Sequence, residues 1–185
     1  MRPQKGKQKI FESAMTLFEQ QGYFATTIAQ ITQQAGVSKG LVYNYFDSKA
    51  ALLLGLLENA TQKMQGNAQI LSAEKGVEVS LAEFLDGFFA FLVKEKRFLK
   101  LQLTLMLTPE LNDIVKQSVS ARAELLLNIV QHWLTELQKP DAEQKARLFI
   151  ALLDGVALHY LSIYEDYPLS SLQQPIQASL LKLIA

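Results

Sequence analysis

The sequence predicts an all-α protein, and three observations support this prediction. Good helix formers, chiefly Leu, Ala, Gln, Glu and Lys, dominate the 185 residues. Apolar residues recur three or four positions apart over long segments, which is the spacing of a buried helical face. Helix-ending residues such as Gly22, Pro109, Pro140 and Pro168 follow these segments.

Four helices are expected in the first third of the chain, at about residues 5–21, 26–35, 39–45 and 49–65. Thr26 or Thr27 caps the second helix, and Ser38 and Ser48 cap the next two, because a hydroxyl oxygen can accept from an N–H of the first turn. Gly36 allows the sharp turn between the second and third helices, since glycine tolerates a positive φ. The expected inward-facing residues include Ile10, Ala14, Leu17, Phe18, Ile28, Ile31, Ala35, Val42 and Phe46.

Five further helices are expected, at about residues 81–96, 98–107, 111–138, 141–164 and 171–184. The apolar pattern loosens near residues 66–78, between two lobes. We therefore divide the chain into a helix-turn-helix domain at residues 1–55 and a larger helical domain at residues 56–185. The helix at residues 49–65 connects the two.

Charge is unevenly distributed, although the formal net charge is zero. The first sixty residues hold six Lys or Arg and four acids, a balance of +2, which leaves −2 for the remainder. Arg2, Lys5, Lys7 and Lys9 form a basic segment that suits contacts to DNA phosphates. A frayed, solvated chain end has the same composition, so both interpretations stay open.

The chain contains no cysteine, which excludes disulfides and thiolate chemistry and fits a cytoplasmic location. No apolar run follows the basic N-terminus, so we expect no signal peptide. Residues 148–164 are apolar, but they fall short of the roughly 20 residues of a membrane span and contain Asp154 and His159. We expect a buried helix of a soluble protein and no contact with a membrane.

Residues 26–49 read as a helix, a tight turn, a second helix and the cap of another, which is how a helix-turn-helix places a short helix in the DNA major groove. That pattern alone is weakly specific. Its wider context, however, resembles the N-terminal domain of the tetracycline-repressor (TetR-like) family of bacterial regulators. The resemblance fades after Leu57 and rests on residues 14–18, 22–23, 26–28, 31, 35–40, 42–43, 45–46 and 48–49.

The resemblance implies a dimeric all-α protein with a three-helix DNA-reading unit and a ligand pocket in the larger lobe. It implies DNA contacts from Thr27, Ser38, Lys39, Gly40, Leu41, Tyr43, Asn44 and Lys49. In this scheme Thr27 touches a phosphate, while Tyr43 and Lys49 clamp the DNA backbone. Lys39 and Leu41 lie nearest the base edges. The chain departs from its relatives in lacking a histidine around Asn44, whose amide can still bind phosphate or read adenine.

The chemistry of these residues is compatible with such roles. Gly40 lets the helix backbone approach the groove closely, and Lys39 can donate to guanine or to phosphate. Leu41 offers only an apolar contact, so base readout is sparse, which favours a dimer on palindromic double-stranded DNA. Structural roles also stay open, with Tyr43 and Tyr45 as core aromatics, Lys49 as a solvated helix-start lysine and Thr27 as a cap.

The segment at residues 148–161 is apolar on nearly every face, so in a soluble protein it must be covered on both sides. One side belongs to the core of its own lobe. We expect the other side to meet a second copy of the chain beside the last helix, as the resemblance also implies. The expected homodimer interface contains Leu152, Val156, Tyr160, Ile176 and Leu180. A monomer with a thick core is the alternative.

A ligand pocket in the larger lobe is expected to be lined by Phe84, Phe88, Met106, Trp133, Phe149 and His159. Large helical lobes hold apolar cavities with a few polar groups, although aromatic residues at helical spacing are also ordinary core residues. His159 can equally be a satisfied core histidine. Neither His159 nor His132 has the spacing of a metal site, so no metal is expected.

These patterns predict a DNA-binding transcriptional repressor that a small, hydrophobic effector releases from a palindromic operator. A dimeric regulator without an effector is the alternative. An enzyme is not expected, because the chain lacks a nucleophile elbow, metal-ligand spacing and a Gly-rich phosphate loop. The best acid–histidine pair, Asp154 and His159, is five residues apart, which is poor geometry on one helix face. No cofactor is expected.

Overall fold

A computed structural model of the chain describes the backbone of residues 2–68 and 70–185. It describes the side chains of these residues except at positions 2–4, 63–68, 112 and 114. The predicted basic segment therefore includes one side chain, that of Arg2, which lies outside the described residues.

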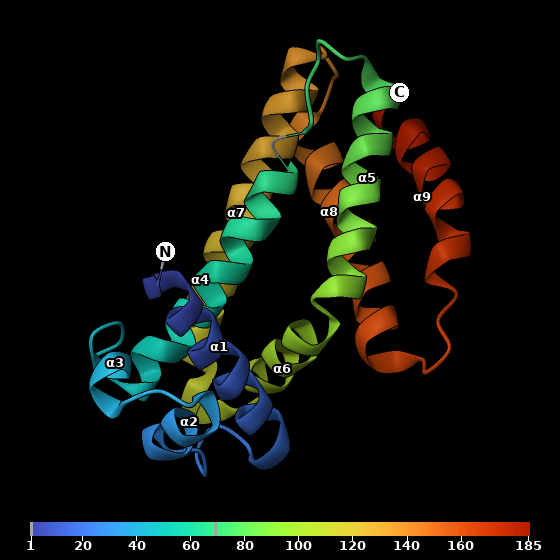
Figure 1. Cartoon of the computed structure of the whole chain (residues 1–185). Helices are drawn as coiled ribbons and strands as arrows, with labels where there is room; N and C mark the ends of the chain where they lie inside the picture. Colours follow the sequence, from blue (N-terminus) through green and yellow to red (C-terminus); the bar gives the residue numbers. More distant parts are fainter. Residues whose placement is uncertain (1, 69) are drawn as a thin grey trace. The chain divides into compact units, whose positions relative to one another are not determined.

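The all-α prediction is confirmed, since the described residues form helices and connecting turns and no strand. Figure 1 shows the helices in chain order: α1 (Arg2–Gln21), α2 (Ile28–Ala35), α3 (Lys39–Tyr43), α4 (Lys49–Ala68), α5 (Val77–Lys94), α6 (Lys96–Met106), α7 (Asn112–Glu136), α8 (Ala142–Leu158) and α9 (Leu169–Ile184). A short 3₁₀-helix, η1 (Pro109–Leu111), precedes α7. The single helix expected at residues 141–164 is wrong in its last part, because α8 is followed by a π-helical turn, η2 (His159–Ile163).

The described chain divides into two compact units, which we treat separately. Unit 1 contains residues 1–60 and 101–118, and unit 2 contains residues 61–100 and 119–185. Helices α4, α6 and α7 each contribute residues to both units. The domain division expected after residue 55 stays a prediction, and residues 101–118 group with the N-terminal helices in these units.

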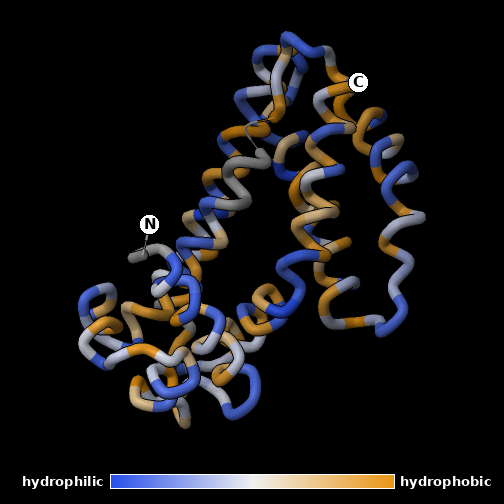
Figure 2. The backbone as a smooth tube through the Cα atoms, in the orientation of Figure 1, coloured by the Kyte–Doolittle hydropathy of each residue, from blue (hydrophilic) through white to orange (hydrophobic). Residues whose placement is uncertain are grey.

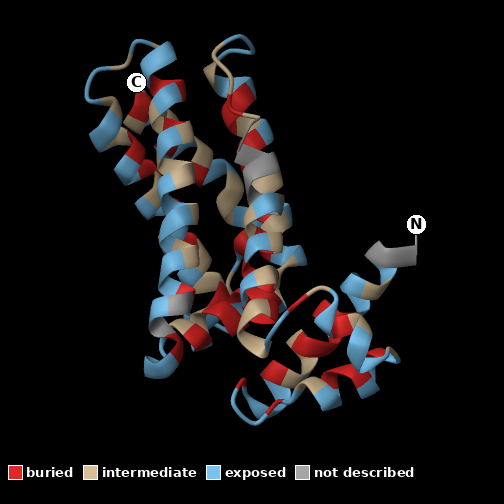
Figure 3. Cartoon of the chain, turned by 90° about the vertical axis from the view of Figure 1, so that its left-hand side faces the viewer, coloured by how far each residue is buried: buried red, intermediate tan, exposed pale blue. Residues whose placement is uncertain are grey.

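Unit 1 is built around α1, which packs against α2 and α3. The predicted inward positions Val42 and Phe46 are buried, and the ring centroids of Phe46 and Phe11 lie 5.4 Å apart. Buried and exposed residues are interspersed along these helices (Figure 3), as amphipathic helices require. The buried apolar residues of α1, α2 and α4 in this unit are Ile10, Phe11, Ala14, Phe18, Ile31, Ala35, Leu52, Leu53, Leu56, Leu57 and Ala60.

The predicted caps of unit 1 are confirmed, and the structure chooses between the two threonines. Thr27 caps α2 in a capping box: the Thr27 N–H donates to Gln30 Oε1 at 2.8 Å, and the Gln30 N–H donates to Thr27 Oγ1 at 3.2 Å. Thr26 is buried, and its hydroxyl donates to the Gly22 carbonyl instead. Gly36 ends α2 at φ +63°, a left-handed conformation that glycine adopts without steric cost.

Unit 2 contains α5 and α8, which both pack against α9. Hydrophobic and hydrophilic residues alternate along these helices (Figure 2), which is the pattern expected where one helical face is buried. Pro175 lies in the first half of α9, where the helix continues despite the missing N–H. The buried apolar residues of these three helices are Leu81, Phe84, Leu85, Phe89, Leu92, Ala146, Phe149, Leu153, Val156, Leu169, Ile176, Leu180 and Ile184.

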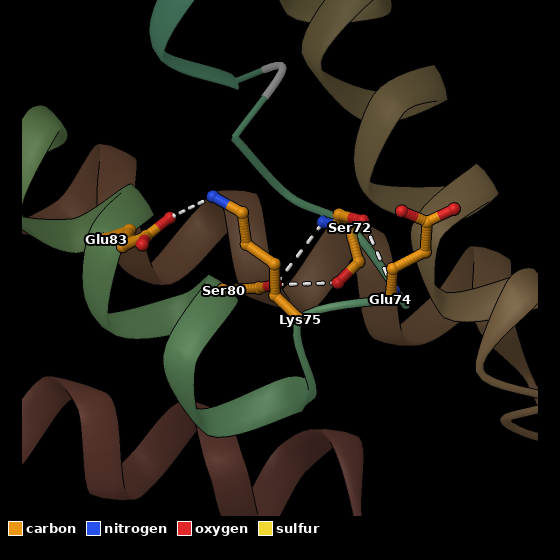
Figure 4. Close-up of polar contacts among 5 residues, drawn as sticks. All are labelled: Ser72, Glu74, Lys75, Ser80 and Glu83. Atoms are coloured by element: carbon orange, nitrogen blue, oxygen red, sulfur yellow. Dashed lines mark hydrogen bonds and ion pairs between the residues drawn. The ribbon is translucent and has the colours of Figure 1, made fainter.

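The connection that precedes α5 is held by serine side chains (Figure 4). The buried Ser80 hydroxyl donates to the Ser72 carbonyl at 2.6 Å, and the Ser72 N–H donates back to Ser80 Oγ at 3.4 Å. At the surface, the Lys75 ammonium pairs with Glu83 at 2.7 Å. Because α5 begins at Gly76–Val77 without a side-chain cap, these contacts position its first turn.

Candidate nucleic-acid interface and ligand-binding residues

Helix α3 presents most of the residues that were expected to contact DNA. Ser38 accepts from the Leu41 N–H at 3.2 Å and so begins the helix. Lys39, Gly40 and Asn44 are exposed, and 44% of the Tyr43 surface is accessible. The alternative role of Tyr43 as a core aromatic is therefore wrong, and this face of α3 is open to solvent.

Leu41 differs from its neighbours, because its side chain is half-buried rather than exposed. A Cβ atom built on Gly6 of α1 would lie only 3.2 Å from Leu41 Cδ2. Helix α1 thus approaches Leu41 closely at a glycine, and Leu41 packs partly within unit 1. This contact reduces the apolar surface that Leu41 offers to a base edge.

Exposed basic side chains lie on α1 and at the start of α3. Lys5, Lys7 and Lys9 are exposed on α1, so the described part of the basic segment is helical. The Lys7 ammonium lies 5.4 Å from the Phe11 ring centroid, and the Lys39 ammonium lies 5.7 Å from that of Tyr43. Such cation–π contacts at exposed sites are weak and leave the ammonium groups accessible to phosphate.

Lys49 is engaged within the chain rather than directed at solvent. Its ammonium donates to the carbonyl oxygens of Tyr23 at 2.7 Å, Phe24 at 3.2 Å and Thr26 at 2.7 Å. These three bonds use all three donors of the ammonium group. Burial lowers the pKa of Lys49 below its ordinary value. The interpretation of Lys49 as a solvated lysine is wrong, and a direct phosphate contact would require these bonds to be exchanged.

The N-terminus of α2 is likewise satisfied internally. The hydroxyl of Thr27 donates to Gln30 Oε1 at 3.0 Å while accepting from the Gln30 N–H. Gln21 Nε2 lies within hydrogen-bond distance of Gln30 Oε1 and Thr26 Oγ1, at 3.2 Å each, which joins the end of α1 to this cap. Thr27 remains exposed, so the N-terminus of α2 is accessible to a phosphate.

The residues expected to line a ligand pocket separate into three groups. Phe84, Trp133 and Phe149 are buried in unit 2. The ring centroid of Phe149 lies 5.7 Å from that of Phe84 and 6.5 Å from that of Trp133. Phe88 stacks on Phe84 at 6.4 Å. His159 instead lies in η2, with its ring beside those of Tyr164 and Tyr167. The remaining expected residue, Met106, belongs to unit 1.

Trp133 contains an unusual polar atom. The side chain is 1% exposed, and its indole Nε1 has no hydrogen-bond partner among the described residues. An unsatisfied buried donor costs roughly 1–3 kcal/mol, so such groups are rare and are often explained by a ligand or water. The aromatic group of Phe84, Trp133 and Phe149 therefore has one donor available to a bound acceptor.

A surface cavity of about 400 Å³ lies between α7 and α8 in unit 2. Sequence reasoning did not identify its lining, although the residues recur at helical spacing on each helix. They are Ser120, Ala123, Glu124, Leu127, Arg147, Ile150, Ala151 and Asp154. Burial raises the pKa of Asp154 above its ordinary value, and the nearby charge of Arg122 opposes part of this rise. Burial lowers the pKa of Arg122. Asp154 thus interacts with Arg122 of α7.

The expected interface residues do not share one surface. Val156, Ile176 and Leu180 are buried within unit 2, so they present little surface to a second chain, and their place in a dimer interface stays a prediction. Leu152 is exposed, and Tyr160 is half-buried with the Lys96 ammonium 4.1 Å from its ring centroid. The large exposed apolar residues of α8 are Leu148, Leu152 and Leu158, at 57%, 36% and 45%.

One helical segment of the described chain, Ala142–Ile163, is long and apolar enough to cross a membrane by length and composition. Its inner face, with Phe149 and Leu153, is buried in unit 2. The side of this segment that was expected in the core of its own lobe is therefore buried, and the cover expected from a second chain on the other side stays a prediction. Among the described residues, no group of three or more acidic or histidine side chains is placed to hold a metal ion.

Comparison with known proteins relates the chain to bacterial regulators. Residues 10–56 match the family model described as bacterial regulatory proteins, tetR family. The chain is 31% identical over 162 residues to the HTH-type transcriptional regulator BetI 1 of Chromohalobacter salexigens, which covers 82% of this chain and 77% of that protein. It is 35% identical over 115 residues to the HTH-type transcriptional regulator YerO of Bacillus subtilis, covering 60% of this chain and 39% of YerO.

A solved structure shows the same fold. The crystal structure of a transcriptional regulator of the TerR/AcrR family from Aquifex aeolicus matches this chain with a TM-score of 0.76 at 24% identity. The match covers 97% of this chain and 99% of the other.

Proposed function

We propose a repressor function for this chain, which belongs to the TetR family of bacterial regulatory proteins. It is a DNA-binding transcriptional regulator with an all-α fold. The observation that supports its DNA-reading surface best is the exposed face of α3, where Lys39, Gly40, Tyr43 and Asn44 are accessible together. This helix is five residues long and enters a major groove with its N-terminal end towards the bases.

The residues of this surface can make two kinds of contact, to base edges and to phosphates. Lys39 can donate to a base edge or a phosphate, and Asn44 can do either through its amide. Gly40 allows a close approach of the backbone, and the exposed Tyr43 hydroxyl can donate to a phosphate. Because few side chains reach bases, one half-site carries little sequence information. The chain therefore acts as a homodimer on a palindromic operator, with two α3 helices one helical turn apart.

The outer face of α8 supports the dimer. Leu148, Leu152 and Leu158 are exposed on this helix, while Phe149 and Leu153 on its inner face are already buried. A second copy would cover these leucines, and burial of apolar area is the main driving force of such association. The exposed leucines therefore form the centre of the proposed interface. Val156, Ile176 and Leu180 do not, because they are buried in the core of one chain.

Release from DNA is proposed to follow binding of a small, hydrophobic effector in unit 2. The aromatic group of Phe84, Trp133 and Phe149 supports an apolar effector. The Trp133 indole N–H, which has no hydrogen-bond partner in the described part of the chain, supports one with a hydrogen-bond acceptor. Effector binding would favour a subunit arrangement whose recognition helices no longer fit two major grooves. Helix α4, which has residues in both units, is the proposed link.

The close packing of the same three aromatic residues favours the alternative, a dimeric regulator without an effector. Trp133 distinguishes the two, because it is the one tryptophan of the chain and its fluorescence reports on this site directly. Saturable changes in its emission with an apolar compound, accompanied by release of operator DNA, support the effector. A compound panel that leaves both signals unchanged supports the alternative. In either case the chain is proposed to act in the cytoplasm, away from membranes, and without catalysis.

The test of DNA reading is selection of bound sites from a random duplex library, with the mass of the complex measured. A palindromic site bound by an even number of chains is expected, with weaker binding by Lys39→Ala and Tyr43→Phe. Lys182→Ala is the matched control, since Lys182 is exposed at the end of α9. Failure to enrich any sequence at moderate salt, or equal loss with Lys182→Ala, would contradict the proposal.

A further inference from the structure

Unit 1 contains a partly enclosed cavity of about 310 Å³, separate from the residues considered for the effector. It lies between the end of α1 with its following loop and the segment formed by α6 and η1. Its lining residues are Phe18, Gln21, Gly22, Tyr23, Phe24, Ala25, Leu101, Thr104, Leu105, Thr108 and Leu111. We propose that this cavity is a second small-molecule site, which binds a neutral, apolar molecule and strengthens operator binding.

The lining determines the class of ligand. None of the described residues that line the cavity carries a charge, so a charged ligand would lose its hydration without gaining a partner. Phe18, Leu105 and Leu111 form buried apolar walls. Phe24, in contrast, is 59% exposed, and an apolar ligand would cover part of its ring. A volume near 300 Å³ is at the lower end for small-molecule sites, so the ligand is a compact aromatic or branched aliphatic molecule.

Few polar side chains line this cavity, and most of them already form hydrogen bonds within the chain. The Thr108 hydroxyl donates to the Thr104 carbonyl at 3.0 Å, and Gln21 Nε2 contacts Thr26 and Gln30 in the cap of α2. The lining thus has little hydrogen-bonding capacity to offer. Affinity comes from apolar contact, and one neutral polar group on the ligand is sufficient.

The loop at residues 22–25 connects this cavity to the DNA-reading surface. Lys49 donates to the carbonyls of Tyr23 and Phe24, two residues that also line the cavity. Its third bond goes to Thr26, directly before the Thr27 cap of α2. A ligand in the cavity therefore contacts the segment that holds α2 in place.

The direction of the effect follows from linkage. The cavity is present in a conformation in which the capping box is formed and α3 is exposed. A ligand that fills the cavity in this conformation stabilises it relative to others, and operator binding is expected to tighten. The proposed effector of unit 2 has the opposite effect. The existence of the site does not depend on the proposed repressor function, because ligand binding is measured without DNA.

The test uses N-phenylnaphthylamine, a neutral apolar probe that fluoresces in apolar surroundings. The full chain with Trp133→Phe and Phe24→Trp carries one tryptophan, placed at the cavity. Saturable energy transfer from this tryptophan to the probe is expected. Thr108→Phe, which fills the cavity, is expected to weaken probe binding by at least about tenfold, or about 1.4 kcal/mol, because the added ring takes the volume that the probe would occupy.

Thr135→Phe is the matched control, since the Thr135 hydroxyl also donates to the carbonyl four residues earlier but lies in unit 2. It should leave the transfer unchanged. If Thr108→Phe fails to fold, Ala25→Leu replaces it. Equal probe affinity in the chain with Trp133→Phe and Phe24→Trp and in its filled variant would overturn the site. Saturating probe that leaves operator affinity unchanged, or lowers it, in a chain that binds its operator would overturn the regulatory effect.

Discussion

The Lys49 ammonium lies 2.7 Å from the carbonyl oxygen of Tyr23 and 4.4 Å from the centroid of its ring. One cation thus holds both the backbone and the side chain of a residue 26 positions earlier in the chain. Tyr23 follows Gly22, at φ +83°, where α1 has ended. The contact fixes the loop that leads into α2, so a lysine in the DNA-reading unit here has a positioning role.

Lys49→Met should weaken operator binding without changing its dependence on salt. The substitution removes three bonds from a charged donor, and we expect the free energy of unfolding to fall by roughly 1–3 kcal/mol. Operator affinity should fall because the cap of α2 is less well held. The slope of log affinity against log salt should stay constant, since no phosphate contact is lost, and filter binding over a salt series measures it.

Lys39→Met provides the comparison, because the Lys39 side chain is exposed beside Tyr43. Loss of one phosphate contact should reduce the salt slope by about 0.9. A similar reduction for Lys49→Met would show that Lys49 leaves its carbonyl partners and binds phosphate in the complex.

Gly55→Ala should destabilise unit 1 although alanine is the better helix former. A Cβ atom at this position of α4 would lie 2.7 Å from Phe46 Cε1 and 3.5 Å from Phe11 Cζ. Overpacking of this kind costs about 1–3 kcal/mol, which exceeds the gain in helix propensity of about 1 kcal/mol. Urea unfolding measures the loss. In a double-mutant cycle, Phe46→Leu should make the same substitution less costly, and simple additivity would argue against the contact.

Leu152→Glu should convert the proposed dimer to monomer while leaving the helical content unchanged. Leu152 is exposed on the outer face of α8, so a glutamate there is solvated in one chain but buried and unpaired in a dimer. Sedimentation equilibrium gives the mass, and circular dichroism gives the helical content. Val93→Glu is the control, since Val93 is 60% exposed on α5 and outside the proposed interface. A dimer that persists in the α8 variant would exclude this surface.

Arg122→Met should destabilise the chain more at neutral than at acidic pH. Burial already raises the pKa of Asp154, and loss of the opposing Arg122 charge should raise it further. Between the unfolded and the folded pKa, the folded chain binds more protons than the unfolded chain. Its stability is therefore retained at low pH and lost as the pH rises through this interval. Urea midpoints across a pH series measure the effect.

Adding Asp154→Asn to this variant should remove most of the additional pH dependence, because asparagine does not titrate. A pH dependence that survives in the double variant would assign the effect to another group. Arg147→Met is a suitable control, since Arg147 pairs with Glu143 at 2.9 Å on the exposed surface.

Several features of unit 1 could be predicted from the sequence because they depend on neighbours along the chain. The hydroxyl of Ser38 reaches an N–H three residues later, and Gly36 needs only its own backbone freedom. The inward positions Val42 and Phe46 follow from helical periodicity. Thr26 and Thr27 could not be distinguished, because both precede α2 and only the packing of α1 decides which one is buried.

The sequence by itself determined the helical class, the caps, the left-handed turn at Gly36 and which residue types α3 exposes. Each of these depends on local hydrogen bonds and helical spacing. Tertiary structure alone decided which apolar faces were used within one chain. Leu180 and Leu148 are equally apolar, yet Leu180 is buried in the core and Leu148 is exposed. It also decided the partners of Lys49 and the lining of both cavities. These relationships join residues far apart in the chain, and no periodic pattern specifies which two helical faces meet.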